Sequence, residues 1–125
     1  MPGVETRLPI VFTEGVIRGR LTRERFVELT STAPARIFGL TKKGRIEPGA
    51  DADLIVVDPD RELTVSAAVL HSDIDYSPYD GMKLNGFPTW TISRGQVIID
   101  EGDLSAERGR GRLVERVPID RPSLE

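Results

Sequence analysis

Residues 49–58, G-A-D-A-D-L-I-V-V-D, join a turn to a short apolar segment. The segment at 54–57 contains three β-branched side chains, and Pro59 follows shortly after it. A short, continuous apolar run with such borders is typical of a strand buried on both faces. Aspartates in turns mostly bond the nearby backbone, so we interpret those around this run as structural rather than as general acids or bases. They are Asp51, Asp53, Asp58 and Asp60.

Strand signals continue downstream of this segment. Residues 89–93 and 96–99 are rich in β-forming side chains, and Arg94-Gly95 separates them. A two-residue connection that contains glycine predicts a hairpin, here at 89–100. The following D-E-G-D sequence predicts another turn. We therefore expect residues 45–104 to be rich in β-structure.

Helical signals dominate the sequence before residue 44. Thr22 is placed to cap a helix over residues 22–30, with Leu21 and Phe26 at the positions of a hydrophobic staple. Phe26, Leu29 and Thr30 share one face, which is expected to pack. Ala33-Pro34 is expected to break this helix and to start a second short one that ends at Gly39.

Length and composition limit the classes of protein that this sequence can encode. A chain of 125 residues is too short for a complete (β/α)8 barrel, which needs about 250. With 38% hydrophobic and 30% charged residues it has the composition of a soluble globular protein. The start of the chain, with the apolar run at 8–12, is expected to be the middle of a protein rather than a natural N-terminus.

Charge and cysteine content bear on partners and compartment. Seventeen basic and 20 acidic residues are interspersed, so no nucleic-acid partner is expected. No run is long and apolar enough for a membrane helix, and cysteine is absent, so we expect a cytoplasmic protein without a membrane partner. Residues 105–125 form an Arg/Gly-rich C-terminal tail. Its arginines are expected to be solvated beside Glu107 and Glu115, with a phosphate or RNA contact as the alternative.

Groups for catalysis are scarce. His71 is the only histidine, with Asp73 and Asp75 close in sequence, and we interpret it as a surface or hydrogen-bonded structural group rather than a metal ligand. A serine nucleophile such as Ser72 would have only this histidine as its base, and neither a nucleophile elbow nor a phosphate-binding loop is present. We assign no catalytic residue and no metal ligand.

Four blocks of sequence carry a family resemblance. Residues 1–7, 26–40, 49–58 and 91–98 are together similar to the C-terminal part of the hydantoinase and dihydropyrimidinase group, relatives of dihydroorotase and allantoinase. The resemblance implies an α/β fragment. Residues 1–44 would be the last loop and helices of a metal-dependent (β/α)8 barrel, and residues 45–104 the C-terminal strands of a small composite β-sandwich.

The same resemblance implies a function. The chain would be the C-terminal portion of a hydrolase that acts on carbon–nitrogen bonds of cyclic amides, with a divalent metal, zinc by resemblance, in the full-length family. The histidines, lysine and aspartate that bind this metal lie before the first block, so none is carried over. Pro2 and Gly3 would lie near the substrate-facing loop.

Two hypotheses about the partner of this chain follow. The chain would be inactive alone, and it would pair with an N-terminal barrel segment or form a homo-oligomer. The alternative is a non-catalytic, β-rich assembly module or subunit that pairs with a separate N-terminal chain, since unpaired strand edges tend to find partners.

Overall fold

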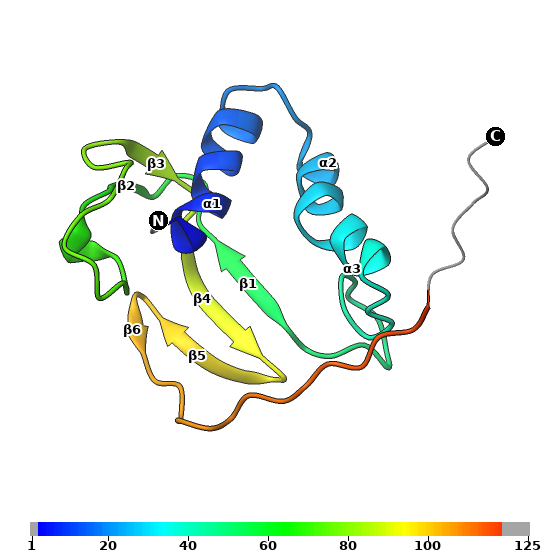
Figure 1. Cartoon of the computed structure of the whole chain (residues 1–125). Helices are drawn as coiled ribbons and strands as arrows, with labels where there is room; N and C mark the ends of the chain where they lie inside the picture. Colours follow the sequence, from blue (N-terminus) through cyan, green and yellow to red (C-terminus); the bar gives the residue numbers. More distant parts are fainter. Residues whose placement is uncertain (1–2, 119–125) are drawn as a thin grey trace.

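The computed structural model of this protein describes residues 3–118, and helices precede strands along the chain (Figure 1). α1 (Val4–Val11) continues directly into a π-helical turn, η1 (Phe12–Ile17). α2 (Arg23–Val27), a second π-helical turn, η2 (Glu28–Thr32), and α3 (Ala33–Ile37) follow as another helical run. No helix in this part of the chain is both long and apolar enough to cross a membrane.

The second helical run corrects one expectation from the sequence. The helix begins as predicted, because the side chain of Thr22 accepts a hydrogen bond of 3.2 Å from the N–H of Arg25. The predicted break at Ala33-Pro34 is wrong, because Ala33 keeps helical φ and ψ angles of −65° and −44°. Pro34 lies in the first turn of α3, where a missing N–H is tolerated, and the turn before it, η2, is π-helical. Gly39 ends the run with a φ of +67°, as expected.

The predicted packing face of this helix is only partly buried. Phe26 is buried, and its ring meets that of Phe12 edge to face with centroids 5.4 Å apart. Leu29, in contrast, is 42% exposed. The contact between the two helical runs is therefore made through the two phenylalanines.

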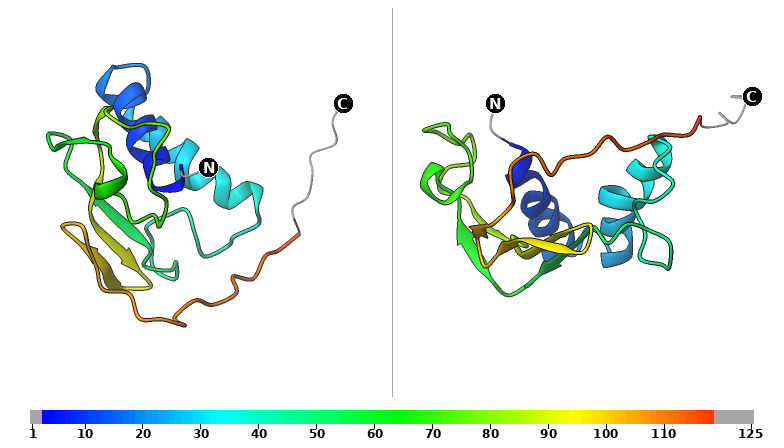
Figure 2. Two further views of the ribbon diagram at one scale, coloured as in Figure 1. Left: turned by 60° about the vertical axis from the view of Figure 1, so that its left-hand side comes forward. Right: turned by 90° about the horizontal axis from the view of Figure 1, so that it is seen from below.

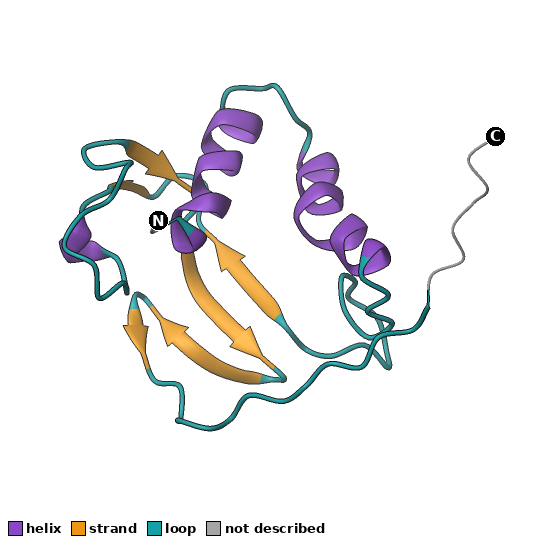
Figure 3. Ribbon diagram, viewed as in Figure 1, coloured by secondary structure: helices purple, strands orange, loops and turns teal. Residues whose placement is uncertain are grey.

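The strands form two antiparallel sheets: in the view of Figure 3 the larger lies below the helices and the smaller lies beside α1. Within residues 3–118 the larger sheet has the strand order β1-β4-β5-β6 and the smaller one pairs β2 with β3. A 3₁₀ turn, η3 (Ala67–Val69), lies between β2 and β3. The strands are β1 (Leu54–Val57), β2 (Glu62–Thr64), β3 (Lys83–Asn85), β4 (Pro88–Ser93), β5 (Gln96–Asp100) and β6 (Asp103–Leu104).

The hairpin predicted at 89–100 is confirmed as β4 and β5. Arg94 and Gly95 both have positive φ, 51° and 79°, as a type I′ turn requires. The side chain of Asp53 accepts a 2.7 Å hydrogen bond from the N–H of Arg94, and the carbonyl of Ala52 accepts one of 2.9 Å from Gly95. The turn before β1 thus holds the tip of the hairpin.

β1 is a strand, but the expectation that it is buried on both faces is wrong. Ile55 is 45% and Val56 is 41% exposed. β1 lies at the edge of its sheet and pairs only with β4 there. An apolar run shows that a strand can be buried, whereas burial itself depends on which elements pack over the sheet.

The best-packed region lies between α1, η1 and the smaller sheet. Val65 and Leu84 have no exposed surface. The hydroxyl of Thr13 donates to the carbonyl of Asn85 at 3.1 Å and accepts from the N–H of Asn85 at 2.8 Å, which joins η1 to β3. Gly86, with a φ of +82°, lets the ring of Phe12 approach closely. A Cβ there would lie 2.5 Å from Cδ1 of Phe12.

Residues 105–118 run back along the molecule to α3 (Figure 2). The guanidinium of Arg110 donates to the carbonyl of Ser93 at 2.9 Å, and the N–H of Val117 donates to the carbonyl of Gly39 at 3.0 Å. The expected pairing of the tail arginines with Glu107 and Glu115 does not occur among the described residues. Besides its bond to Ser93, Arg110 accepts a hydrogen bond at its carbonyl oxygen from the guanidinium of Arg94. Residues 119–125 of the tail lie outside the described part.

Candidate functional site

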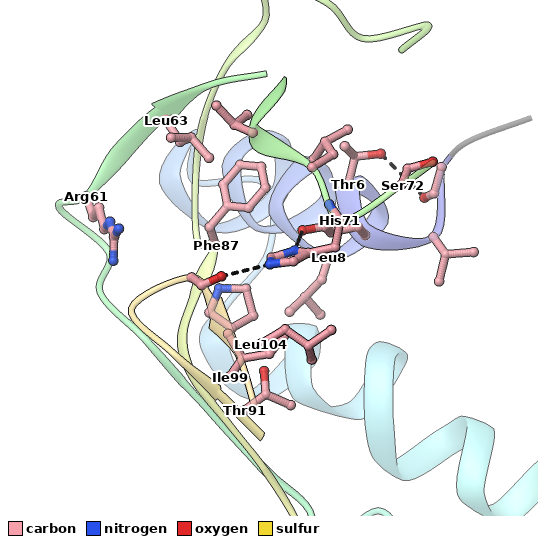
Figure 4. A pocket seen from close by; sticks show the side chains of 17 residues that line it. Thr6, Leu8, Arg61, Leu63, His71, Ser72, Phe87, Thr91, Ile99 and Leu104 are labelled. Atoms are coloured by element: carbon pink, nitrogen blue, oxygen red, sulfur yellow. Dashed lines mark hydrogen bonds and ion pairs between the residues drawn. The ribbon is translucent and has the colours of Figure 1, made fainter. Parts of the chain in front are cut away.

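An open, mostly apolar pocket of about 550 Å³ lies between the start of α1, the loop at 69–72 and strands β4 to β6 (Figure 4). Its polar side chains include Glu5, Arg61 and His71. Its apolar walls come from all of these elements. They include Leu8, Leu63, Leu70, Phe87, Ile99 and Leu104.

His71 points into this pocket, and three hydrogen bonds hold it (Figure 4). Its N–H donates to Oε2 of Glu5 at 2.8 Å, and its Nδ1 lies 2.8 Å from Oε1 of the same carboxylate. Its Nε2 lies 2.8 Å from the carbonyl oxygen of Gly102. An ionised carboxylate and a carbonyl both only accept, so both contacts are satisfied when both ring nitrogens carry hydrogen. The hydrogen bond to Glu5, and after it the one to Gly102, raises the pKa of His71.

This histidine does not fit a metal site. A metal ligand needs a free lone pair on one ring nitrogen, and here both nitrogens are bound to oxygen acceptors. Asp73 and Asp75 are exposed, and no group of three potential ligands gathers anywhere in residues 3–118. The arrangement supports the interpretation of His71 as a hydrogen-bonded structural group.

The serines show no sign of activation. Ser72 lines the pocket beside His71, but no hydrogen bond joins its hydroxyl to the ring, whose nitrogens contact Glu5 and Gly102. Ser77 is buried, and its hydroxyl accepts a 3.2 Å hydrogen bond from the N–H of Tyr79. Such a bond to the backbone two residues on is typical of serine in a turn. Neither serine has an activating partner among the described residues.

Three of the four aspartates around β1 make the local contacts that the sequence indicated. Lys43 binds Asp51, with Nζ 2.8 Å from Oδ2, and it also binds Asp53. Hydrogen bonds to Asp51, and after it to Asp53, raise the pKa of Lys43. Partial burial tends to raise the pKa of Asp53. The hydrogen bonds from Lys43 and from the N–H of Arg94 outweigh this effect, so the pKa is lowered. Asp58 accepts a 2.9 Å hydrogen bond from the N–H of Asp60.

Gly3 lines the pocket just before α1, whereas Pro2 lies outside the described residues. The carbonyl of Gly3 accepts a hydrogen bond of 3.2 Å from the N–H of Arg7, which starts the helix. The nearness of Pro2 and Gly3 to a substrate loop stays a prediction. Sequence reasoning did not find the contact of Glu5 with His71, because 66 residues separate them and no local pattern links such positions.

Comparisons with known proteins agree with the fold. Residues 13–99 match the amidohydrolase family. The chain is 44% identical, over 125 residues, to D-phenylhydantoinase from Escherichia coli, with 99% of this chain and 27% of the relative covered. The chain thus spans about a quarter of the length of this relative.

Solved structures give the same result. D-hydantoinase (dihydropyrimidinase) from Thermus sp. superposes with a TM-score of 0.90 at 40% identity, covering 95% of this chain and 26% of that one. L-hydantoinase (dihydropyrimidinase) from Arthrobacter aurescens has a TM-score of 0.82 at 42% identity, covering 87% and 24%. The chain therefore belongs to the amidohydrolase family and is of the hydantoinase/dihydropyrimidinase type.

Proposed function

We propose that this chain works as the C-terminal portion of a hydrolase that opens cyclic amides such as hydantoins or dihydropyrimidines. Such a reaction adds water across a ring amide, breaks its carbon–nitrogen bond and leaves a carboxylate and a ring-opened nitrogen group. The observation that carries the proposal is the 44% identity to a D-phenylhydantoinase over almost the whole chain.

The finer architecture is part of the proposal. Residues 1–44 would close a (β/α)8 barrel with their helices, and residues 45–104 would supply strands to a composite β-sandwich. The apolar side chains exposed on the larger sheet support this, because a sandwich sheet buries such a face against a second sheet. They include Val56, Trp90 and Val97.

The chain would be inactive alone. Metal-dependent amide hydrolysis needs several converging ligands and an open position for water. The described residues offer no such group, and the single histidine is bound on both ring nitrogens. A divalent metal, zinc by resemblance, would be held by residues beyond those in this chain. The chain's own contribution would be to support the start of α1, next to Gly3, on a rigid base.

The partner and the compartment are proposals as well. A polypeptide that carries the barrel segment would cover the exposed sheet, and the whole would work in the cytoplasm. The alternative is a non-catalytic assembly module, which the same exposed apolar side chains favour. Size-exclusion chromatography with light scattering tests the second alternative. A well-folded monomer in solution would count against assembly through copies of this chain.

The central test is enzymatic. The purified chain is incubated with zinc, and ring opening of hydantoin and dihydrouracil is followed, alone and after co-expression with a hydantoinase segment that carries the metal ligands. We expect no turnover for the chain alone and measurable turnover for the pair. Turnover by the metal-loaded chain alone would show that this chain is not inactive alone, contrary to the proposal. Failure of a properly co-folded pair to turn over either ring would count against the proposed reaction.

A further inference from the structure

Three segments that lie far apart in the sequence meet at one imidazole ring. Glu5 belongs to α1, His71 to the loop before β3, and Gly102 to the turn between β5 and β6. The ring contacts residues 66 and 31 positions away, and all three residues line the pocket of about 550 Å³. Figure 4 shows the ring between its two partners, with both hydrogen bonds drawn.

We propose that His71 is a pH-dependent clasp: protonated, it ties α1 to the β5–β6 turn across the rim of the pocket, and deprotonated, it releases the turn. The proposal concerns this chain's own conformation and does not depend on the proposed reaction.

The argument rests on donors and acceptors. An ionised carboxylate and a backbone carbonyl both only accept, whereas neutral imidazole has one N–H and one lone pair. Neutral His71 would therefore leave a lone pair facing an oxygen 2.8 Å away, and that contact would be repulsive. Only the imidazolium ion satisfies both sides.

The two contacts are unequal, and this decides which one opens. Glu5 is held twice, through Nδ1 and through the backbone N–H of His71, and its bond to the ring is charge-assisted. Gly102 offers a single neutral carbonyl to Nε2. A neutral ring would keep its hydrogen on Nδ1 for Glu5 and release Gly102.

Charged groups near His71 and Gly102 determine how far the β5–β6 turn would move when His71 loses its proton. Glu5 faces the ring from α1, and Asp73 lies on the ring's own loop. Next to Gly102, Glu101 is paired with Arg61 at 2.6 Å, and Asp103 begins β6. Since the Arg61–Glu101 pair does not involve His71, release of Gly102 would loosen the turn without detaching it. Ile99 and Leu104 on this side of the pocket would become more accessible.

The direction of the pH dependence follows from linkage. Contacts with Glu5 and Gly102 raise the pKa of His71 in the folded chain above its ordinary value of about 6.5. The stabilisation is therefore fully present below about pH 6.5, and it is lost as the pH rises through the folded-state value.

The chain carries one histidine, so its imidazole gives a single NMR signal that can be titrated in the full chain. We expect a pKa above 6.5, with Glu5→Gln moving it back toward that value and the distant control Glu28→Gln leaving it in place. Fluorescence of the apolar dye ANS should rise about twofold or more through the same titration. A pKa at or below 6.5, or one that Glu5→Gln does not change, would overturn the proposal.

The variant His71→Gln separates the clasp from other titrating groups. Glutamine does not titrate, so the rise in dye fluorescence between pH 6 and 9 should disappear. A rise of the wild-type size in His71→Gln would place the transition elsewhere and would also overturn the proposal. If this variant does not fold, the histidine signal of the wild type and of Glu5→Gln decides the matter.

Discussion

The two sheets of this protein differ in how far residues 3–118 can bury them. The smaller sheet packs against α1 and η1, where Val65 and Leu84 have no exposed surface. On the larger sheet Val56, Trp90 and Val97 are each more than 40% exposed. Each strand of the smaller sheet has a single apolar side chain, Leu63 or Leu84, whereas β1 and β5 are rich in apolar, β-branched residues. The first region therefore finds its packing partner within the described chain, whereas the second presents an apolar face that, under the proposed function, another polypeptide would cover.

The largest expected effect tests the buried side of this comparison. Leu84→Ala removes a fully buried side chain and should lower the free energy of unfolding by about 2 to 5 kcal/mol. Val97→Ala, at a residue 44% exposed, is the matched control and should cost less than about 1 kcal/mol. Urea denaturation monitored by circular dichroism measures both. Equal losses would show that the two sheets are packed alike.

A smaller effect is expected at the contact of η1 with the end of β3. Gly86→Ala places a Cβ 2.5 Å from the ring of Phe12 at a φ of +82°, and it should cost about 2 to 4 kcal/mol in backbone and packing strain. Gly95→Ala has nearly the same φ, +79°, with open space around the Cβ. It should cost only the backbone strain, about 1 kcal/mol. Thermal unfolding of the two variants side by side gives the packing contribution, and a cost at Gly95 as large as that at Gly86 would argue against it.

The smallest expected effect concerns the hairpin tip of the larger sheet. Asp53→Asn removes one of the two carboxylate partners of Lys43 and should lower stability at pH 7 by about 0.5 to 1 kcal/mol, a modest loss because the group is partly exposed. The pKa of Asp53 is lowered in the folded chain, so its stabilisation is present above about pH 4 and is lost as the pH falls through the folded value. The variant should therefore lose less stability than the wild type on acidification. Asp80→Asn, at an exposed residue, serves as the control and should follow the wild-type curve.

Several features could be predicted because they depend on neighbouring residues. The cap at Thr22, the left-handed Gly39 and the Arg94-Gly95 turn each follow from a few side chains and from the angles that they allow. The structural role of Asp53 also followed from its place in a turn, although its partners Lys43 and Arg94 did not. Those partners come together only when the hairpin folds back on the turn.

The sequence by itself determined the family, the succession of helices and strands, and the scarcity of catalytic groups. The family follows from four similar blocks of sequence, the succession of elements from capping and turn residues, and the scarcity from the single histidine. Only the tertiary structure decided that the helix passes through Pro34, that β1 stays half exposed at a sheet edge, and that Glu5, His71 and Gly102 meet. These features depend on contacts between distant segments. Burial and protonation respond to the groups that packing brings together, and local sequence does not contain that information.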